Sequence, residues 1–206
     1  MSVDKGRRKF RLSFNAPIVL GFVTLCLIAT TLGVLTGGRL TQGFFMTYHS
    51  SLAFPLTYLR FFTHILGHAG WEHFFGNMMY ILLLGSLLEE KYGAATMIET
   101  ILITALVTAL VNYIFFPYQA LCGASGVVFA FILLASFTSF KEGEVPLTFI
   151  LIAVFFIGQQ VVEGITVSDN ISNISHICGG VVGSIIGFAL NKQKPVNNTS
   201  KYNIHY

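Results

Sequence analysis

The chain has 206 residues, of which 54% are hydrophobic and only 10% carry charge, and its formal net charge is +3. Soluble domains have about 25% charged residues, so the composition favours an integral membrane protein over a soluble helical bundle with a large core. The small positive charge is typical of span ends that contact anionic lipid, and it does not indicate a nucleic-acid partner.

Six transmembrane helices are predicted from runs that contain no Asp, Glu, Lys or Arg, because about 20 apolar residues cross the hydrocarbon core. The longest run, 100–140, is long enough for two helices, and the segment Pro117-Tyr118-Gln119 with the glycine-rich turn after it divides the run. The predicted spans are 15–36, 73–90, 94–115, 124–140, 146–162 and 172–191. We therefore expect an all-α integral membrane protein, with a six-span domain over 13–191 between short polar tails at 1–12 and 192–206.

The positively charged residues set the predicted orientation, because Lys and Arg concentrate on the cytoplasmic side of membrane proteins. With six spans, ten of the twelve fall on one side, and only Arg39 and Arg60 fall on the other. Both tails are therefore expected in the cytoplasm. The protein is expected in the plasma or inner membrane of the cell. A signal peptide is the alternative for the basic, apolar start, but the apolar run is long and lacks a clear small-x-small cleavage site.

The connection between the first two spans, residues 37–72, is long and rich in aromatic residues, and it lies on the non-cytoplasmic side. Long ordered loops in small domains are usually functional, and this one is expected to lie partly in the membrane interface. An aromatic belt that only anchors the protein is the alternative. Its polar residues include Arg60, His64 and His68.

A serine stands between glycines at the expected start of the fourth span, in Gly123-Ala124-Ser125-Gly126. The two glycines permit a tight turn and the close approach of a neighbouring helix. A helix N-terminus offers unpaired backbone N–H groups to an anion, which is what the oxyanion of an acyl-transfer reaction needs. The alternative is that Ser125 is an N-cap residue and Gly126 a packing residue.

His176 is an ionisable residue inside the last apolar run, and such residues are functional by default. Offsets of 3, 7 and 11 place Gly179, Gly183 and Gly187 on the same helical face. Small residues at this spacing let membrane helices pack closely. If the partner is the fourth span, the imidazole reaches the Ser125 hydroxyl; a structural histidine bonded to a backbone carbonyl is the alternative.

His73 and Asn77 are four residues apart, which places both on one face of the second span near its non-cytoplasmic end. Both side chains can donate hydrogen bonds to an oxyanion, together with the backbone N–H of Ser125. Hydrogen bonding between helices is the alternative role. In the predicted topology His73, Asn77, Ser125 and His176 all fall in the non-cytoplasmic leaflet.

A metal site is the rival prediction from another functional class. His49, His64, His68 and His73 lie on one side of the membrane, and His64 and His68 have the spacing of one helical turn. Zinc binds such clusters, but no carboxylate or cysteine completes this one, so no metal and no cofactor is expected.

The three cysteines, Cys26, Cys122 and Cys178, show neither CxxC nor metal-ligand spacing. Each is expected to be a small buried apolar residue. The sequence leaves open whether Cys122 and Cys178 pair.

Taken in order, these features resemble the rhomboid intramembrane serine proteases over about residues 60–190. The resemblance is carried by Arg60-Phe61, His64, His68, His73-x-x-x-Asn77, Glu89 or Glu90, Gly93, Gly123-x-Ser125-Gly126 and His176-x-x-Gly179-x-x-x-Gly183. The chain differs at Leu59, where the family often has Trp. The resemblance implies a Ser125–His176 dyad, an oxyanion hole that includes His73 and Asn77, and a first loop lying partly in the membrane.

The expected function is therefore that of an intramembrane serine endopeptidase whose site opens to the non-cytoplasmic side. Its expected partners are the bilayer and single-span membrane proteins, whose transmembrane segments it cleaves. Two alternatives stay open: a catalytically inactive rhomboid-like protein that binds membrane helices, and the histidine-cluster metal-binding protein. The natural substrate and the oligomeric state cannot be predicted from the sequence.

Overall fold

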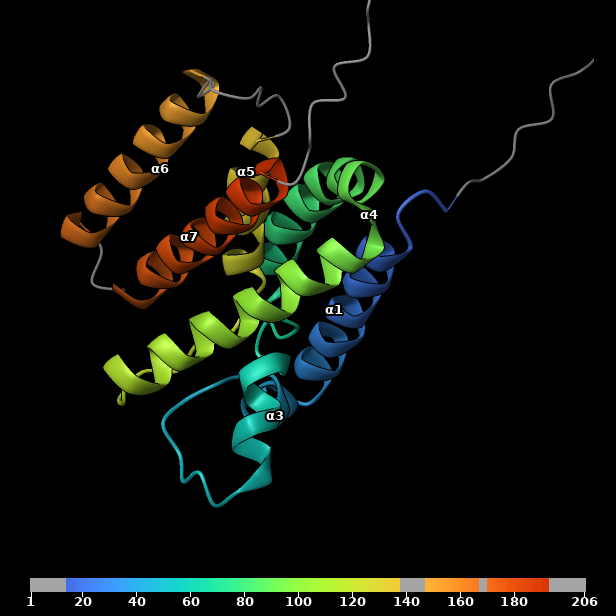
Figure 1. The fold of residues 1–206 in the computed structure, drawn as a ribbon. Coiled ribbons are helices and arrows are strands. Elements are labelled where there is room, and N and C mark those ends of the chain that lie inside the picture. The colour runs from blue at the N-terminus through green and yellow to red at the C-terminus, as the bar shows by residue number, and fades with distance from the viewer. Residues whose placement is uncertain (1–13, 138–146, 167–169, 193–206) are drawn as a thin grey trace, which may run out of the picture.

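The structure, a computed structural model, describes residues 14–137, 147–166 and 170–192 and is shown in Figure 1. The described part is helical, with one isolated antiparallel bridge between Thr47 and Leu121. The helices are α1 (Pro17–Leu35), α2 (Arg39–Phe44), α3 (Pro55–Thr63), α4 (Trp71–Phe115), α5 (Ser125–Ser136), α6 (Leu147–Thr166) and α7 (Asn170–Lys192). The all-α prediction is confirmed. The polar tails, 1–12 and most of 192–206, lie outside the described residues.

Three of the described helices are long and apolar enough to cross a bilayer, which is the mark of an integral membrane protein. They include Pro17–Leu35, Trp71–Phe115 and the segment Asn173–Leu190 of α7. A fourth helix, α5, is apolar but has only 12 described residues. The predicted end of that span, at 138–140, lies outside the described residues, and the count of six spans stays a prediction.

Helix α4 contains two of the predicted spans. Its 45 residues are broken at Gly93, where φ is 83° and ψ is 166°. A continuous helix of that length would be about 67 Å long, more than twice the hydrocarbon core. In Figure 1 the ribbon turns back near the α4 label, so that the two halves of α4 run in roughly opposite directions. The left-handed φ favours glycine at this turn, which explains why the chain reverses here.

Helix α5 lies at the centre of the bundle and contacts α4, α6 and α7. None of its residues is exposed, and Val127, Phe131 and Leu134 are fully buried. Fully buried apolar side chains of this size contribute about 1.5–3 kcal/mol each when removed from water, and in a bilayer their close packing replaces part of that term. Ser125 therefore stands at the end of the most enclosed helix of the described part.

Helix α7 packs against α5 backbone to backbone. A Cβ atom added to Gly179 would lie 2.0 Å from the carbonyl oxygen of Gly126, and one added to Gly183 would lie 2.1 Å from that of Ala130. Further along the same face, Gly187 lies against the ring of Phe137. Only glycine fits at the two backbone contacts, because any Cβ would push the helices apart.

The first loop is an ordered layer on one end of the bundle. The Nε of Arg60 donates a hydrogen bond to the Gly43 carbonyl over 2.8 Å, and its guanidinium lies 4.4 Å from the centre of the Tyr48 ring. On α3, Thr57, Arg60 and Phe61 are buried, whereas Tyr58 is exposed. The loop also pairs with the connection after α4 through the Thr47–Leu121 bridge. The loop therefore supports the segment that leads to Ser125.

Glu89 joins α4 to the start of α1. Its two carboxylate oxygens accept hydrogen bonds from the backbone N–H groups of Ile18 (3.0 Å) and Val19 (2.9 Å). Helix α1 has no side-chain cap of its own, since Ala16 is its N-cap residue. A buried carboxylate there satisfies two otherwise unpaired N–H groups and complements the helix dipole.

We expect Glu89→Gln to lower the free energy of unfolding by about 1–3 kcal/mol, because the charge is lost and one oxygen becomes an N–H donor facing another donor. The measurement is the thermal unfolding midpoint in detergent. The matched control is Glu90→Gln, since Glu90 is the exposed neighbour. Equal midpoints for the two variants would show that Glu89 does not stabilise the α1–α4 contact.

Candidate active site

Four of the residues singled out from the sequence line one cavity. The cavity has a volume of about 440 Å³ and is formed by α4, the connection 116–124, α5 and α7. The residues that line it are His73, Gly76, Asn77, Tyr80, Leu121, Cys122, Ser125, Val128, Phe129, Ile132 and His176. A serine, two histidines and an asparagine from three different helices thus share one space.

Ser125 is the first residue of α5, and the residue at the N-cap is Ala124, which makes no side-chain cap hydrogen bond. The alternative interpretation of Ser125 as an N-cap residue is therefore wrong. A residue at this position has a backbone N–H without a partner inside the helix. The hydroxyl and the backbone N–H of Ser125 are both available for chemistry at the cavity.

Gly123 fixes the approach to Ser125. Its φ is +126°, and its N–H donates to the His64 carbonyl over 2.9 Å. A Cβ added to Gly123 would lie 2.7 Å from Cε1 and 2.8 Å from Nε2 of His73. The backbone before Ser125 therefore touches the imidazole edge of His73, which no other residue type would permit.

His176 lies one turn before Gly179 on α7. Gly179 contacts Gly126, the residue after Ser125, so the closest approach of the two helices lies beside the serine. The His176 ring lies against the Phe129 ring, with ring centroids 4.3 Å apart and the planes tilted by 39°. This contact limits the rotation of the imidazole. Phe129 was not identified from the sequence, although its place four residues after Ser125 puts it on the same face of α5.

Asn77 has a buried amide donor. The residue is 8% exposed, and its Nδ2 has no hydrogen-bond partner among the described residues. His73, one turn earlier on α4, is partly buried and lines the same cavity. Unpaired buried polar groups are rare in folded proteins and call for an explanation. The explanation offered here is that the Nδ2 of Asn77 is a donor for a negatively charged reaction intermediate.

The four histidines of the rival metal prediction occupy different surroundings. Burial lowers the pKa of His64 to about 4, and its ring contacts Arg60 and Thr108 rather than another histidine. His49 stacks on Tyr113, while His68 and His73 touch with ring centroids 5.0 Å apart. Across the described residues, no three His, Cys, Asp or Glu side chains gather as ligands for one metal ion.

The three cysteines are free thiols, so Cys122 and Cys178 do not pair. Cys122 lines the cavity that holds Ser125. Burial raises the pKa of the Cys122 thiol to about 11, which leaves it protonated at neutral pH.

We expect alkylation of Cys122 to block access to Ser125. Because the thiolate is the nucleophile and the pKa is raised, the rate of inactivation by iodoacetamide should rise about tenfold per pH unit until the pH nears 11. The measurement is residual activity, assayed at one pH, after treatment at several pH values. The variant Cys122→Ala should resist the reagent, and inactivation of that variant at the wild-type rate would assign the effect to another thiol.

Comparison with known proteins identifies the family. A family model described as the Rhomboid domain matches residues 55–193. The chain is 31% identical over 157 residues to Rhomboid-related protein 2 of Mus musculus, and the match covers 66% of this chain and 52% of that protein. It is 27% identical over 159 residues to Rhomboid-like protein 11, chloroplastic, of Arabidopsis thaliana, with 70% and 55% covered.

The chain therefore spans about half the length of these relatives. A third relative, Rhomboid-related protein 1 of Caenorhabditis elegans, is 28% identical over 140 residues, with 64% of this chain and 39% of that protein covered. The family match includes every residue that lines the cavity described above. Because it extends over more than half of the chain, this protein belongs to the rhomboid family.

Proposed function

We propose that this protein is an intramembrane serine endopeptidase that cleaves membrane-spanning segments of other proteins through a Ser125–His176 dyad. The observation that carries the proposal is that Ser125, His176, His73 and Asn77 line one cavity at the N-terminus of α5. Membership of a family whose members are usually serine proteases supports it. Two of the helices that line the cavity, α4 and α7, are apolar and long enough to cross a membrane, which suits a site within a bilayer.

In the proposed reaction, His176 takes the Ser125 proton as the general base, and the serine oxygen attacks the scissile carbonyl carbon. The peptide C–N bond then breaks as His176 returns the proton to the leaving amine. A water molecule, activated by the same imidazole, hydrolyses the acyl-enzyme and releases the new carboxylate. The described residues that line the cavity include no carboxylate, and the ring of Phe129 is one contact that orients His176.

The oxyanion of the tetrahedral intermediate needs donors that are already in place. Three candidate donors lie on the cavity wall: the backbone N–H of Ser125, the Nδ2 of Asn77 and an N–H of His73. Fixed donors in a site of low dielectric stabilise the developing charge without reorganising. The contact between Gly123 and His73 holds the first and last of these donors together.

An apolar groove beside the cavity supports the proposal that the substrate is a membrane-spanning segment. A second space of about 460 Å³ lies between α4, α5 and α6, and its lining includes Leu83, Ala135 and Ile152. Tyr80 and Ile132 line both this space and the catalytic cavity. A segment entering from lipid between α4 and α6 would thus reach Ser125 along a continuous wall. The helix must unwind locally, because helical peptide bonds are shielded by the backbone.

The proposed orientation places both termini in the cytoplasm and the cavity near the opposite membrane surface. Glu89 binds the start of α1 just before the Gly93 turn. The cavity lies at the other end of that half of α4, at His73 and Asn77. Lys91 falls at the first of these ends, and the basic residues 5–11 precede α1 in the sequence, which supports assigning that end to the cytoplasm.

The test is cleavage of a single-span model substrate by the purified protein in liposomes, with and without a metal chelator. We expect internal cleavage of the substrate, detected by mass spectrometry of the new termini, at the same rate in both samples. Loss of cleavage with the chelator would favour the metal-binding alternative. Binding of the substrate without any cleavage would favour the inactive rhomboid-like protein.

A further inference from the structure

The catalytic cavity extends from the catalytic residues to the apolar groove. His73 and Ser125 line it near the starts of α4 and α5. Tyr80 and Ile132, each seven residues further along its helix, line both the cavity and the groove. A substrate whose cut bond lies at Ser125 therefore has neighbouring residues between Ser125 and the groove.

The part of the cavity next to the groove lies close to the bond that is cut. A helix rises about 1.5 Å per residue, so α5 advances about 10 Å from Ser125 to Ile132. An extended peptide rises about 3.3 Å per residue. The side chains that enter this part of the cavity therefore belong to the substrate residues within about three positions of the cut bond.

Gly76 lies on the α4 wall of this part of the cavity. It lines the cavity together with His73, Asn77 and Tyr80, and their spacing of 3, 4 and 7 residues places all four on one face of the helix. A Cβ atom added to Gly76 would meet no described atom within 4 Å. The missing side chain of Gly76 therefore leaves open space inside the cavity.

The other glycines of the site have structural reasons that Gly76 lacks. Gly123 has a φ of +126°, and a Cβ on Gly179 would lie 2.0 Å from a backbone carbonyl oxygen. The φ of Gly76 is not positive, and no contact among the described residues excludes a side chain there. A glycine inside a helix is less stable than alanine, so this glycine is explained neither by the backbone nor by packing.

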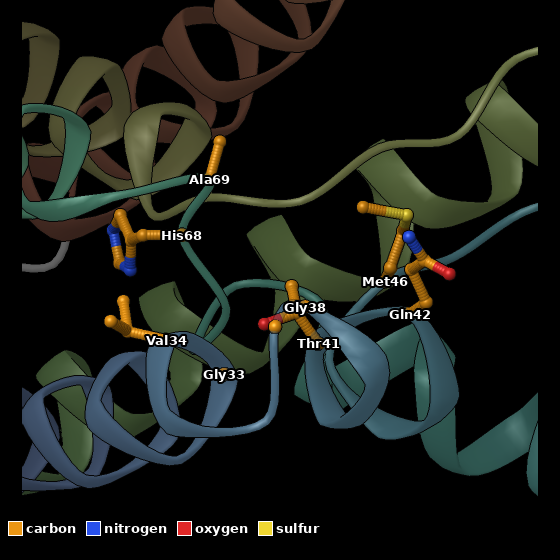
Figure 2. Close-up of a pocket in the computed structure, with 9 residues that line it drawn as sticks. Gly33, Val34, Gly38, Thr41, Gln42, Met46, His68 and Ala69 are labelled. Carbon is orange, nitrogen blue, oxygen red and sulfur yellow. The ribbon is translucent and has the colours of Figure 1, made fainter.

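The cavity at the outer end of α1 is a separate space. Figure 2 shows its lining, which includes Gly33, Thr41, Gln42 and His68. None of the nine residues drawn there lines the catalytic cavity. The space for a substrate side chain near Ser125 therefore lies on the side of the groove and not on the side of α1.

We propose that Gly76 is a specificity-determining residue, which admits a large apolar side chain of the substrate, such as that of Leu or Phe, close to the cut bond. The inference rests on the proposed function, because the substrate is placed at Ser125. Gly76 leaves the space open, and Tyr80, Val128 and Ile132 give it an apolar lining. A substrate with a small side chain there buries less apolar surface and is cut more slowly.

The test is a set of single-span substrates in liposomes that carry Ala or Phe at each of the three positions on either side of the cut bond. We expect wild-type kcat/KM to be at least about tenfold higher with Phe at one of these positions, because one methylene in an apolar pocket changes kcat/KM about 10–200-fold. Gly76→Leu should remove this preference, and Gly76→Ala should reduce it. The ratio of the two rates separates the size of the space from a general loss of catalysis.

The matched control is Gly21→Leu. Gly21 lies within α1, and a Cβ there would also meet no described atom within 4 Å, but Gly21 does not line the catalytic cavity. Both leucine variants should have a raised thermal unfolding midpoint, since leucine is a better helix former than glycine. Only Gly76→Leu should change the preference for Phe. Equal Phe-to-Ala ratios in Gly76→Leu and the wild type would overturn the proposal.

A crosslinking experiment tests the same contact without cleavage. In a Cys122→Ala background, Gly76→Cys should form a disulfide with a cysteine scanned through the substrate segment, when copper phenanthroline is the oxidant. Gly21→Cys should not form one. Cleavage without this disulfide at any position would count against the contact at Gly76. The disulfide without cleavage by the wild type would instead count against the proposed function.

Discussion

Replacement of Ser125 with Ala is expected to reduce cleavage of a single-span substrate by a factor of about 10⁶, which is below detection in most assays. The variant lacks the oxygen atom that attacks the peptide carbonyl in the proposed mechanism. Its fold should persist, because the N-cap residue of α5 is Ala124 and alanine is a better helix former than serine at the first helical position. The measurement pairs the cleavage rate with the thermal unfolding midpoint in the same detergent.

The matched control for this prediction lies on α4. The hydroxyl of Ser86 donates to the Leu82 carbonyl over 2.8 Å, and Ser86 lines neither the catalytic cavity nor the apolar groove. Ser86→Ala should therefore cleave the substrate at nearly the wild-type rate. Equal rates for Ser125→Ala and the wild type would exclude Ser125 as the nucleophile.

Asn77→Ala is expected to lower kcat by about 10²–10³-fold while KM changes little, since an oxyanion donor acts mainly in the transition state. The stability of the variant should stay close to that of the wild type, because the Nδ2 of Asn77 has no partner among the described residues that would be left unpaired. The measurements are kcat and KM on a soluble or single-span substrate, together with the thermal unfolding midpoint. Together they separate a loss of catalysis from a loss of stability.

Asn112→Ala provides the contrast. Its amide nitrogen donates to the Gln119 carbonyl over 3.3 Å, and the residue is buried outside the lining of the catalytic cavity. This variant should have a lower thermal unfolding midpoint than the wild type, with little change in kcat. If Asn77→Ala behaved in the same way, Asn77 would be a structural residue and the oxyanion would need another donor.

The elements that follow from local pattern could be predicted from the sequence. The absence of charge marked the apolar helices, and the charged residues 89–91 marked the break within α4. The spacing of Gly179 and Gly183 indicated a close helix contact, because every fourth residue of a helix shares one face. These properties depend on residues that are near one another along the chain.

The contacts that join distant segments could not be predicted in the same way. Glu89 caps α1, which begins about 70 residues earlier, and no local pattern identifies that partner. The contact between the rings of Phe129 and His176 depends on how α5 and α7 are rotated about their axes. Side-chain orientation in the folded state decides each of these features.

The central claim is that Ser125 is a nucleophile activated by His176. Its most direct measurement is mass spectrometry of the wild-type protein after treatment with a fluorophosphonate, which forms a covalent bond with an activated serine. The account predicts one adduct, on the peptide that contains Ser125, and little adduct in His176→Phe. An adduct on another residue, or undiminished labelling of Ser125→Ala, would contradict it.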